Sequence, residues 1–260
     1  MQWSLLFYLD LGIMFLCWLL CSWNRRAGLV DAAWSFCILL NILITLLFFA
    51  QAPWAVRWVL GLCSALWFAR LSWHLLRRYA QEKQEDRRYA NMRRAMGGYQ
   101  HLGFLLFFIF QAGLAILFSA PIVSLLQLSA EQWQNGWPIA LVVAIAVMAV
   151  AFIGESVADQ QLYRFKQNPA NQGKTLDQGL WRYSRHPNYF FEWLHWFAYP
   201  LVGLAAGMYW LWIYPLLMWL FLYYITGIPF SEQQALRNRG QNYRDYQSKT
   251  SIFIPWKPKQ

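Results

Sequence analysis

Apolar residues in this chain of 260 residues gather into long blocks separated by short polar segments. Four blocks, Ser4–Cys21, Trp34–Ala50, Phe104–Leu126 and Trp137–Ile153, reach or approach the roughly 20 residues that a helix needs to cross a bilayer. They are far longer than the roughly 10 alternating residues of a transmembrane barrel strand. The pattern therefore predicts an all-α, polytopic membrane helix bundle.

About seven spans follow from the full pattern, in one transmembrane domain over residues 1–260. We expect them near residues 4–22, 28–50, 54–76, 102–126, 137–157, 190–206 and 209–228. The first block lacks a basic start and a small-residue cleavage pattern, so we expect it to be a retained span and not a signal peptide.

The charge of the chain is +10 and is sorted by position. Nearly every Lys and Arg falls in the segments 23–27, 77–101, 158–189 and 229–260, which alternate with almost uncharged connections. The positive-inside rule then predicts an N-terminus outside and a C-terminus in the cytoplasm, most simply in a bacterial inner membrane. This sorting argues for membrane lipids as partners and against nucleic acid.

The cytoplasmic run Glu82–Arg94 is dense in charges of both signs. One interpretation is a solvated helix held by local ion pairs. The other is binding of a ligand phosphate, because arginine forks suit phosphate oxygens. The arginines available for it are Arg87, Arg88, Arg93 and Arg94.

A second ionisable stripe ends the fifth expected span. Glu155, Asp159 and Lys166 fall on one side of a helix if that helix continues past the membrane. Ionisable groups at a membrane boundary are costly unless they are paired or used. Both an ion-pair network and a ligand site fit, and we favour the ligand site.

The richest segment runs from Gly179 to Glu192, directly into the sixth expected span. Pro187 fits a first helical turn, which sets Arg185 and His186 at a helix entrance that attracts anions. Beyond it, polar residues recur at every fourth position on one face that should point inward: Asn188, Glu192 and Trp196. Tyr183 also suits simple interfacial anchoring.

Two smaller sets point inward from other spans: Asp31 near the start of the second, and Arg70, His74 and Arg77 near the end of the third. If Asp31 pairs with Arg70 across the bundle, these side chains have a structural role and not a catalytic one. No histidine or cysteine spacing indicates a metal site, and no Gly-x-Gly-x-x-Gly follows a strand. Any nucleotide must therefore bind among the helices and their cytoplasmic connections.

At these positions the chain resembles bacterial integral-membrane proteins related to steroid 5-alpha-reductase, whose C-terminal region is of the 3-oxo-5-alpha-steroid 4-dehydrogenase type. Sterol reductases and isoprenylcysteine carboxyl methyltransferases are more distant relatives. The motifs that carry the resemblance are Asp159-Gln-Gln-Leu, Gly179–Glu192 with Trp196, Gly227-Ile-Pro, and Tyr243-x-x-Tyr246 ending in Phe253-Ile-Pro255.

The resemblance implies an NADPH site in residues 102–260 and a lipid-facing substrate pocket in residues 1–101. By position, the nicotinamide half would contact Asn188, Tyr189, Glu192 and Trp196, and the adenosine and phosphate half Asp159, Lys166 and Lys174. Matching cofactor positions elsewhere are Arg77, Arg87, Tyr89, Glu232 and Tyr243. The remaining cofactor-binding candidates are Glu155, Tyr183, Arg185 and His186.

The chain departs from the family at the catalytic end. The Gln-Glu pair and the tyrosine that polarise the ketone in steroid 5-alpha-reductases are missing, and Asp31 and His74 stand in the corresponding places. Either can donate a hydrogen bond to an enone oxygen, provided that Asp31 is protonated. These two are the catalytic candidates, and the identity of the steroid or other lipid enone stays open.

Three functions are therefore weighed. The first is an NADPH-dependent reductase of a carbon–carbon double bond conjugated to a carbonyl in a hydrophobic substrate. The second is a membrane methyltransferase that uses S-adenosylmethionine, held by Arg185, His186 and Glu232. The third is a lipid-binding or transport protein without a nucleotide site. The sequence leaves the product stereochemistry and the oligomeric state open.

Overall fold

The computed structural model describes residues 2–82 and 84–259. Within them all regular structure is helical, as expected, and no strand occurs. The chain forms two compact units, Met1–Gln134 and Asn135–Gln260. The long helix Gln100–Gln127 lies in the first unit, although the sequence grouped residues 102–126 with the second half of the chain.

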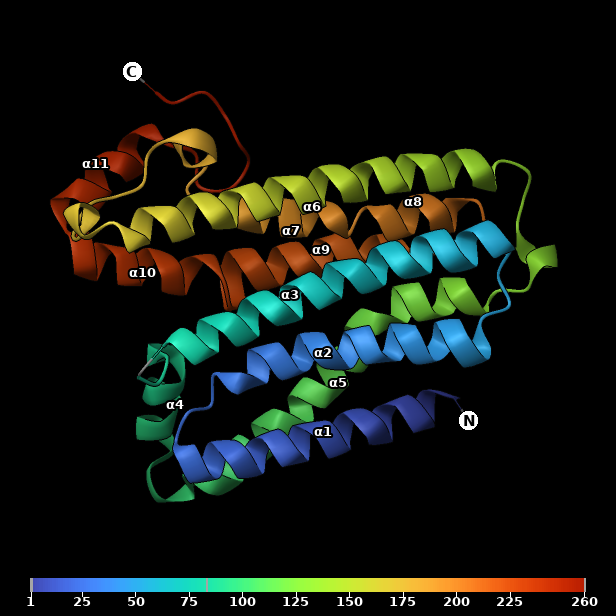
Figure 1. Cartoon of the computed structure of the whole chain (residues 1–260), viewed down its shortest axis with the longest axis horizontal. Coiled ribbons are helices and arrows are strands. Elements are labelled where there is room, and N and C mark those ends of the chain that lie inside the picture. The colour runs from blue at the N-terminus through green and yellow to red at the C-terminus, as the bar shows by residue number, and fades with distance from the viewer. Residues whose placement is uncertain (1, 83, 260) are drawn as a thin grey trace. The chain divides into compact units, whose positions relative to one another are not determined.

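Helix α2 (Leu29–Ile44) is the centre of the first unit (Figure 1) and packs against α1, α3 and α5. Its last turns widen into a π-helix, Thr45–Phe49, and another π-helix, Val56–Leu60, leads into α3. The other helices are α1 (Gln2–Asn24), α3 (Gly61–Gln81), the short α4 (Arg87–Met96) and α5 (Gln100–Gln127).

A polar cluster lies in the apolar core of this unit. Asp10, Asn41 and Ser119, from α1, α2 and α5, are fully buried. The Asn41 amide nitrogen donates to Asp10 Oδ2 at 2.9 Å and to Ser119 Oγ at 3.3 Å. Hydrogen bonds of this kind connect helices where lipid supplies no competing partner. The cluster therefore fixes the register of three spanning helices.

Helix α6 (Trp137–Gln167) is the longest element of the second unit and packs against α7 and α8. Its end at Gln167 shows that the helix does continue through Glu155, Asp159 and Lys166. The later helices are α7 (Pro187–His195), α8 (Ala198–Leu204), α9 (Ile213–Leu220), α10 (Ile228–Arg239) and α11 (Gln241–Lys249). Two further turns extend α9, a 3₁₀ turn at Tyr209–Trp212 and a π-helix at Phe221–Ile225.

Six helical segments of the described chain are long and apolar enough to cross a membrane. They are Gln2–Asn24, Leu29–Phe49, Val56–Gln81, Arg87–Gln127, Trp137–Gln167 and Tyr209–Arg239. Large apolar side chains on them are exposed, such as Leu16, Phe48 and Ile139. These features identify an integral membrane protein with a polytopic helical bundle.

The expected span at 190–206 is instead two short helices, α7 and α8, which meet at Trp196 and Phe197. Pro200 lacks the N–H that would bond to the Trp196 carbonyl, and its ring crowds that oxygen. The chain tightens there, since Trp196 N bonds to Trp193 O and Phe197 N to Leu194 O. The proline thus splits the sixth expected span.

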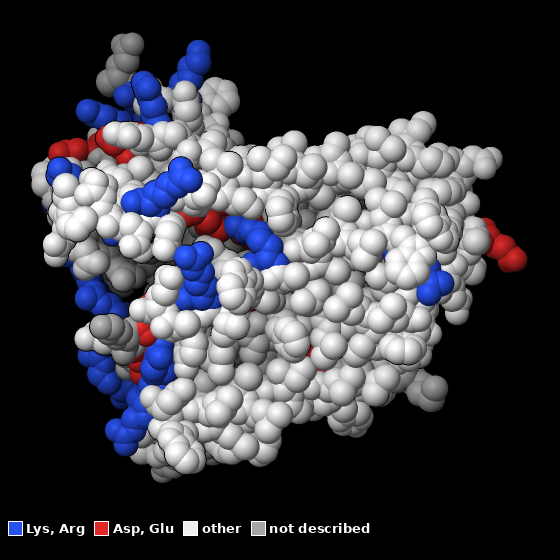
Figure 2. All heavy atoms as spheres, viewed as in Figure 1, with Lys and Arg blue, Asp and Glu red and all other residues white. Residues whose placement is uncertain are grey.

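Basic side chains are unevenly distributed within each unit (Figure 2). In the first unit they gather around α4 and the adjoining end of α3, and in the second around α10, α11 and the last turns of α6. The apolar lengths of the helices carry almost none. Each unit thus has a basic end, in keeping with the charge sorting of the sequence.

Candidate functional site

Gly179 fixes the segment 179–192 onto the last turns of α6. Its φ is +60°, and a Cβ added there would lie 2.5 Å from the Gln161 side chain. Gln161 Oε1 accepts from the Leu180 N–H at 3.0 Å, and Trp181 Nε1 donates to the Ala158 carbonyl at 3.0 Å. Only glycine combines this backbone conformation with so close an approach.

Glu232, on α10, accepts hydrogen bonds from four side chains. Arg185 Nε lies 2.9 Å and His186 Nε2 3.0 Å from its Oε1, and the Tyr243 hydroxyl donates to the same oxygen at 2.7 Å. The Gln247 amide donates to Oε2. We call this set, Arg185, His186, Glu232, Tyr243 and Gln247, the Glu232 clasp.

The clasp holds the C-terminal tail against the segment before α7. Arg185 Nη1 donates to the carbonyls of Gln247 and Thr250 at 3.0 and 3.1 Å. Further along, Arg185 N–H bonds to Ser251 O and Ser184 Oγ to Phe253 O. Arg185, which the sequence places at a helix entrance that attracts anions, is therefore engaged by Glu232 and by the tail.

His186 is 5% exposed, and its ring stacks on Tyr189 at 5.4 Å between centroids. Burial lowers the pKa of His186, and the hydrogen bond to Glu232 offsets this only in part. The imidazole is therefore neutral at pH 7 and donates its Nε2 proton to Glu232. Four candidates from the sequence thus meet in one partly buried network: Arg185, His186, Glu232 and Tyr243.

Polar side chains of α6 and α7 meet where these helices pack. Asn188 Nδ2 donates to Asp159 Oδ1 at 3.2 Å. One α-helical turn further, Glu192 is 8% exposed and accepts from Trp196 Nε1 at 3.1 Å. Glu155 is 5% exposed on α6. The stripe expected to point inward does so for Glu192 and Trp196, and Asn188 is half-buried.

A surface pocket of about 640 Å³ lies beside the end of α6. Three of the residues that line it are cationic, Lys166, Lys174 and Arg239, and none of the described lining residues is Asp or Glu. The remaining lining residues are Leu162, Phe165, Asn168, Pro169, Asn171, Gln172, Gly173, Leu176 and Asn238. The pocket therefore suits an anionic ligand with an apolar or aromatic part.

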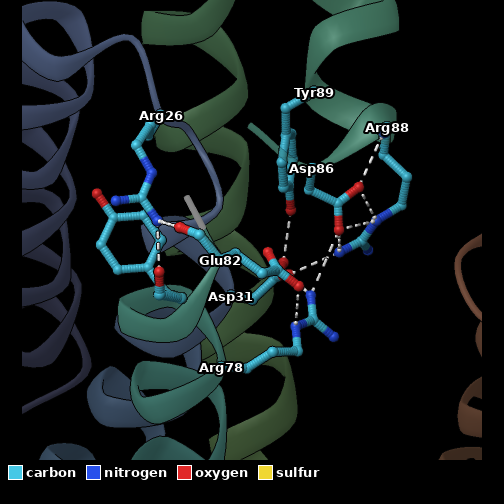
Figure 3. A network of polar contacts seen from close by, with 8 residues as sticks. Arg26, Asp31, Arg78, Glu82, Asp86, Arg88 and Tyr89 are labelled. Carbon is cyan, nitrogen blue, oxygen red and sulfur yellow. Dashed lines mark hydrogen bonds and ion pairs between the residues drawn. The ribbon is translucent and has the colours of Figure 1, made fainter. Parts of the chain in front are cut away.

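In the first unit, Asp31 is the centre of an ion-pair network between α2, α3 and α4 (Figure 3). Arg88 Nη2 lies 2.8 Å and Arg78 Nη2 3.5 Å from Asp31 Oδ2, and the Tyr89 hydroxyl donates to Oδ1 at 2.5 Å. Asp86 extends the network, 3.0 Å from Arg88 and 3.4 Å from Arg78. We call these five residues the Asp31 network.

Asp86 also begins α4, since its Oδ1 accepts from the Arg88 N–H at 2.9 Å. Burial alone would raise the pKa of Asp86, but the hydrogen bonds and charge of Arg88 outweigh it and lower the pKa. Nearby, Arg26 donates to the carbonyls of Tyr79 and Glu82 at the end of α3 (Figure 3). Local ion pairing, one of the two interpretations of residues 82–94, thus accounts for Arg88.

The remaining candidates of the first unit are distributed as follows. Arg93 pairs with Glu85 at 2.7 Å and Arg94 bonds to Asn91, while Arg87 is exposed. On α3, Arg77 is exposed and His74 is half-buried. Tyr89 is 4% exposed and is an anchor for Asp31 in this structure.

Two candidates of the second unit remain: Tyr183, which is exposed, and Tyr189, whose ring stacks on His186. Sequence reasoning missed Arg239 and the three residues that complete the networks, Arg78, Asp86 and Gln247. For Arg239 a signal was present, because it is the last residue before Gly240, a position where a helix commonly ends with a cation nearby.

Comparisons with known proteins give a family but no activity. A family model described as "Protein of unknown function (DUF1295)" matches residues 17–250. An uncharacterized protein of Schizosaccharomyces pombe is 25% identical over 262 residues, covering 92% of this chain and 75% of that protein. No solved structure matches at a significant level. Because the model spans most of its length, the chain belongs to the DUF1295 family.

Proposed function

We propose that this protein is an NADPH-dependent reductase that adds hydride to a carbon–carbon double bond conjugated to a carbonyl in a hydrophobic, steroid-like or other lipid substrate. The observation that carries the proposal is the pocket lined by Lys166, Lys174 and Arg239, with no Asp or Glu among its described lining residues. Two of these cations, Lys166 and Lys174, are those to which the family resemblance assigns the adenosine and phosphate half of the cofactor.

The fit to a dinucleotide rests on the chemistry of the lining. Lysine and arginine are the side chains that bind phosphate oxygens, and Phe165 and Leu176 offer apolar surface to a base. NADPH, when bound, supplies the hydride. The task of the chain is then to hold the phosphates at this pocket and to orient the nicotinamide. Asp159, Asn188 and Glu192, on the packed faces of α6 and α7, are the groups proposed for that orientation.

The two catalytic candidates are no longer equivalent. Both oxygens of Asp31 already accept hydrogen bonds, from Arg78, Arg88 and Tyr89. Asp31 is thus committed to contacts within the Asp31 network. We propose Asp31 as an anchor of α4, and His74, the other catalytic candidate that the resemblance indicates, as the group that polarises the carbonyl.

A methyltransferase that uses S-adenosylmethionine is the second candidate, supported only by the resemblance around Arg185, His186 and Pro187. S-adenosylmethionine has a net positive charge and no phosphate, so a pocket with three cations suits it less well than it suits a dinucleotide. The carboxylate assigned to it, Glu232, is surrounded by the four donors of the clasp. These contacts favour the reductase.

The test is a titration of the purified full chain in detergent with nucleotide, in which the change in tryptophan fluorescence of the protein reports binding. Lys166→Ala and Lys174→Ala should each weaken NADPH binding by about tenfold, the effect of losing one charged hydrogen bond. Lys257→Ala is the matched control, because it removes an exposed lysine outside the pocket. Binding of S-adenosylmethionine with no response to NADPH would refute the proposal, as would a pocket whose lysines do not affect NADPH affinity.

A further inference from the structure

Arg239 belongs to a fixed corner of the second unit. Gly240, with φ of +54°, ends α10 directly after it and begins α11. The two helices pack through Ala235, Tyr243 and Tyr246, and the Arg239 guanidinium carbon lies 5.2 Å from the centre of the Tyr243 ring. This cation–π contact holds a half-buried guanidinium at the pocket wall.

The pocket combines three kinds of surface. Phe165 and Leu176 are apolar, and Gln172 and Asn238 are amides with both donors and acceptors. The third kind is cationic, contributed by α6, by the connection that follows it and by α10. The volume of the whole pocket, about 640 Å³, is within the usual range for a small-molecule site. The adenosine group of a nucleotide matches the apolar and amide surfaces. The cations are then available to the phosphates of that nucleotide.

The phosphate groups of NADPH and NADH differ in charge, so cations in the pocket can distinguish the two cofactors. Each phosphate of the dinucleotide linkage is a diester with one negative charge, whereas a phosphate monoester carries about −1.5 to −2 at pH 7. NADPH differs from NADH only by such a monoester, on the adenosine 2′-oxygen. An arginine fork binds a terminal phosphate through two parallel hydrogen bonds, which a lysine cannot do.

We infer that Arg239 is a specificity-determining residue that binds the 2′-phosphate monoester of the cofactor, so that this pocket selects NADPH over NADH. The inference rests on the proposed function and adds a residue from α10 to it. Lys166 and Lys174 then bind the diester phosphates that both cofactors contain, and Arg239 binds the 2′-phosphate that only NADPH contains.

The experiment compares Arg239→Gln with Arg237→Gln in the full chain, by titrating NADPH and NADH separately. Arg237 lies two residues earlier on the same helix, is exposed and does not line the pocket, so it controls for the loss of one positive charge. Arg239→Gln should weaken NADPH binding by about tenfold or more and leave NADH binding nearly unchanged. Arg237→Gln should change neither.

Two additions keep the result unambiguous. Arg239→Lys keeps the charge but not the fork, and should give an intermediate ratio of the two affinities. Adenosine 2′-monophosphate should compete with NADPH in the wild type and less well in Arg239→Gln, while adenosine 5′-monophosphate should show no such difference. An equal loss of NADPH and NADH binding in Arg239→Gln, or an unchanged ratio, overturns this inference alone. A wild type that binds neither nucleotide removes the proposed function as well.

Discussion

Asn41 shows how much a single buried polar residue decides in this fold. Its amide joins α1 and α5 to α2 through Asp10 and Ser119, at a depth where lipid offers no alternative partner. A hydrophobic residue of similar size would leave the Asp10 carboxyl buried without its donor. The packing of the first unit therefore depends on polar contacts that a hydropathy profile of the sequence does not reveal.

Asn41→Leu should lower the free energy of unfolding by about 1 kcal/mol, the size measured for interhelical hydrogen bonds in membranes. Thermal unfolding in detergent would measure it. Asp10→Asn is the companion variant, because its side-chain oxygen can still accept from Asn41, and it should be closer to the wild type. Equal stability of Asn41→Leu and the wild type would show that the cluster is incidental.

The neutral state of His186 predicts a dependence of stability on pH. Burial lowers the pKa of His186 in the folded chain below its ordinary value of about 6.5. As the pH falls through that value, the unfolded chain binds a proton that the folded chain does not, so stability decreases with falling pH. The stability that the neutral His186 contributes is complete above about pH 6.5 and decreases as the pH falls below this value.

His186→Gln keeps a donor for Glu232 and cannot titrate. The fall in unfolding temperature between about pH 7.5 and 5.5 should therefore be smaller in this variant than in the wild type. Differential scanning fluorimetry across buffers would measure the two slopes. Parallel slopes would mean that His186 does not carry this part of the acid sensitivity.

At the scale of elements, α4 illustrates why a charged run can be structural. Asp86 caps the helix, while Asp31 and Asp86 together neutralise Arg78 and Arg88. Sequence spacing reveals the excess of charge in 82–94 but not its partners, because Asp31 is more than fifty residues away. A separation of 47 and 46 residues likewise hides the clasp, in which Glu232 meets Arg185 and His186.

Asp86→Ala should release the start of α4. Loss of the cap alone costs about 1 kcal/mol, and Arg78 and Arg88 lose a partner in addition. Asp86→Asn keeps the capping oxygen without the charge and should be intermediate. Hydrogen exchange of the amides in 87–96 would report the effect locally, and unchanged protection in Asp86→Ala would contradict the assigned role.

Helices α7 and α8 mark the limit of span prediction. Their apolar composition is that of one spanning helix, and hydropathy contains no information on where it breaks. The position of Pro200, four residues after Trp196, gives a physical reason that is readable in the sequence, although many membrane helices tolerate a proline. Pro121, inside the unbroken α5, is such a case.

For the whole molecule, the helical class, six of the spans and the basic ends of the units were predictable, because span length and charge sorting are direct consequences of the bilayer. The candidate site was predictable only in part. Lys166 and Lys174 do line one pocket, and Glu192 and Trp196 are buried as the helical spacing requires. The tail contacts of Arg185 and the place of Arg239 depend on tertiary packing, which spacing does not encode.

The proposed function requires that the chain binds NADPH, and the ligand selectivity of the wild type would show whether it does. Isothermal titration of the detergent-solubilised full chain with NADPH, NADH and S-adenosylmethionine would give three affinities under one condition. We expect NADPH to bind most tightly, NADH more weakly, and S-adenosylmethionine weakest or not at all. Tight binding of S-adenosylmethionine without binding of NADPH would contradict the proposed function.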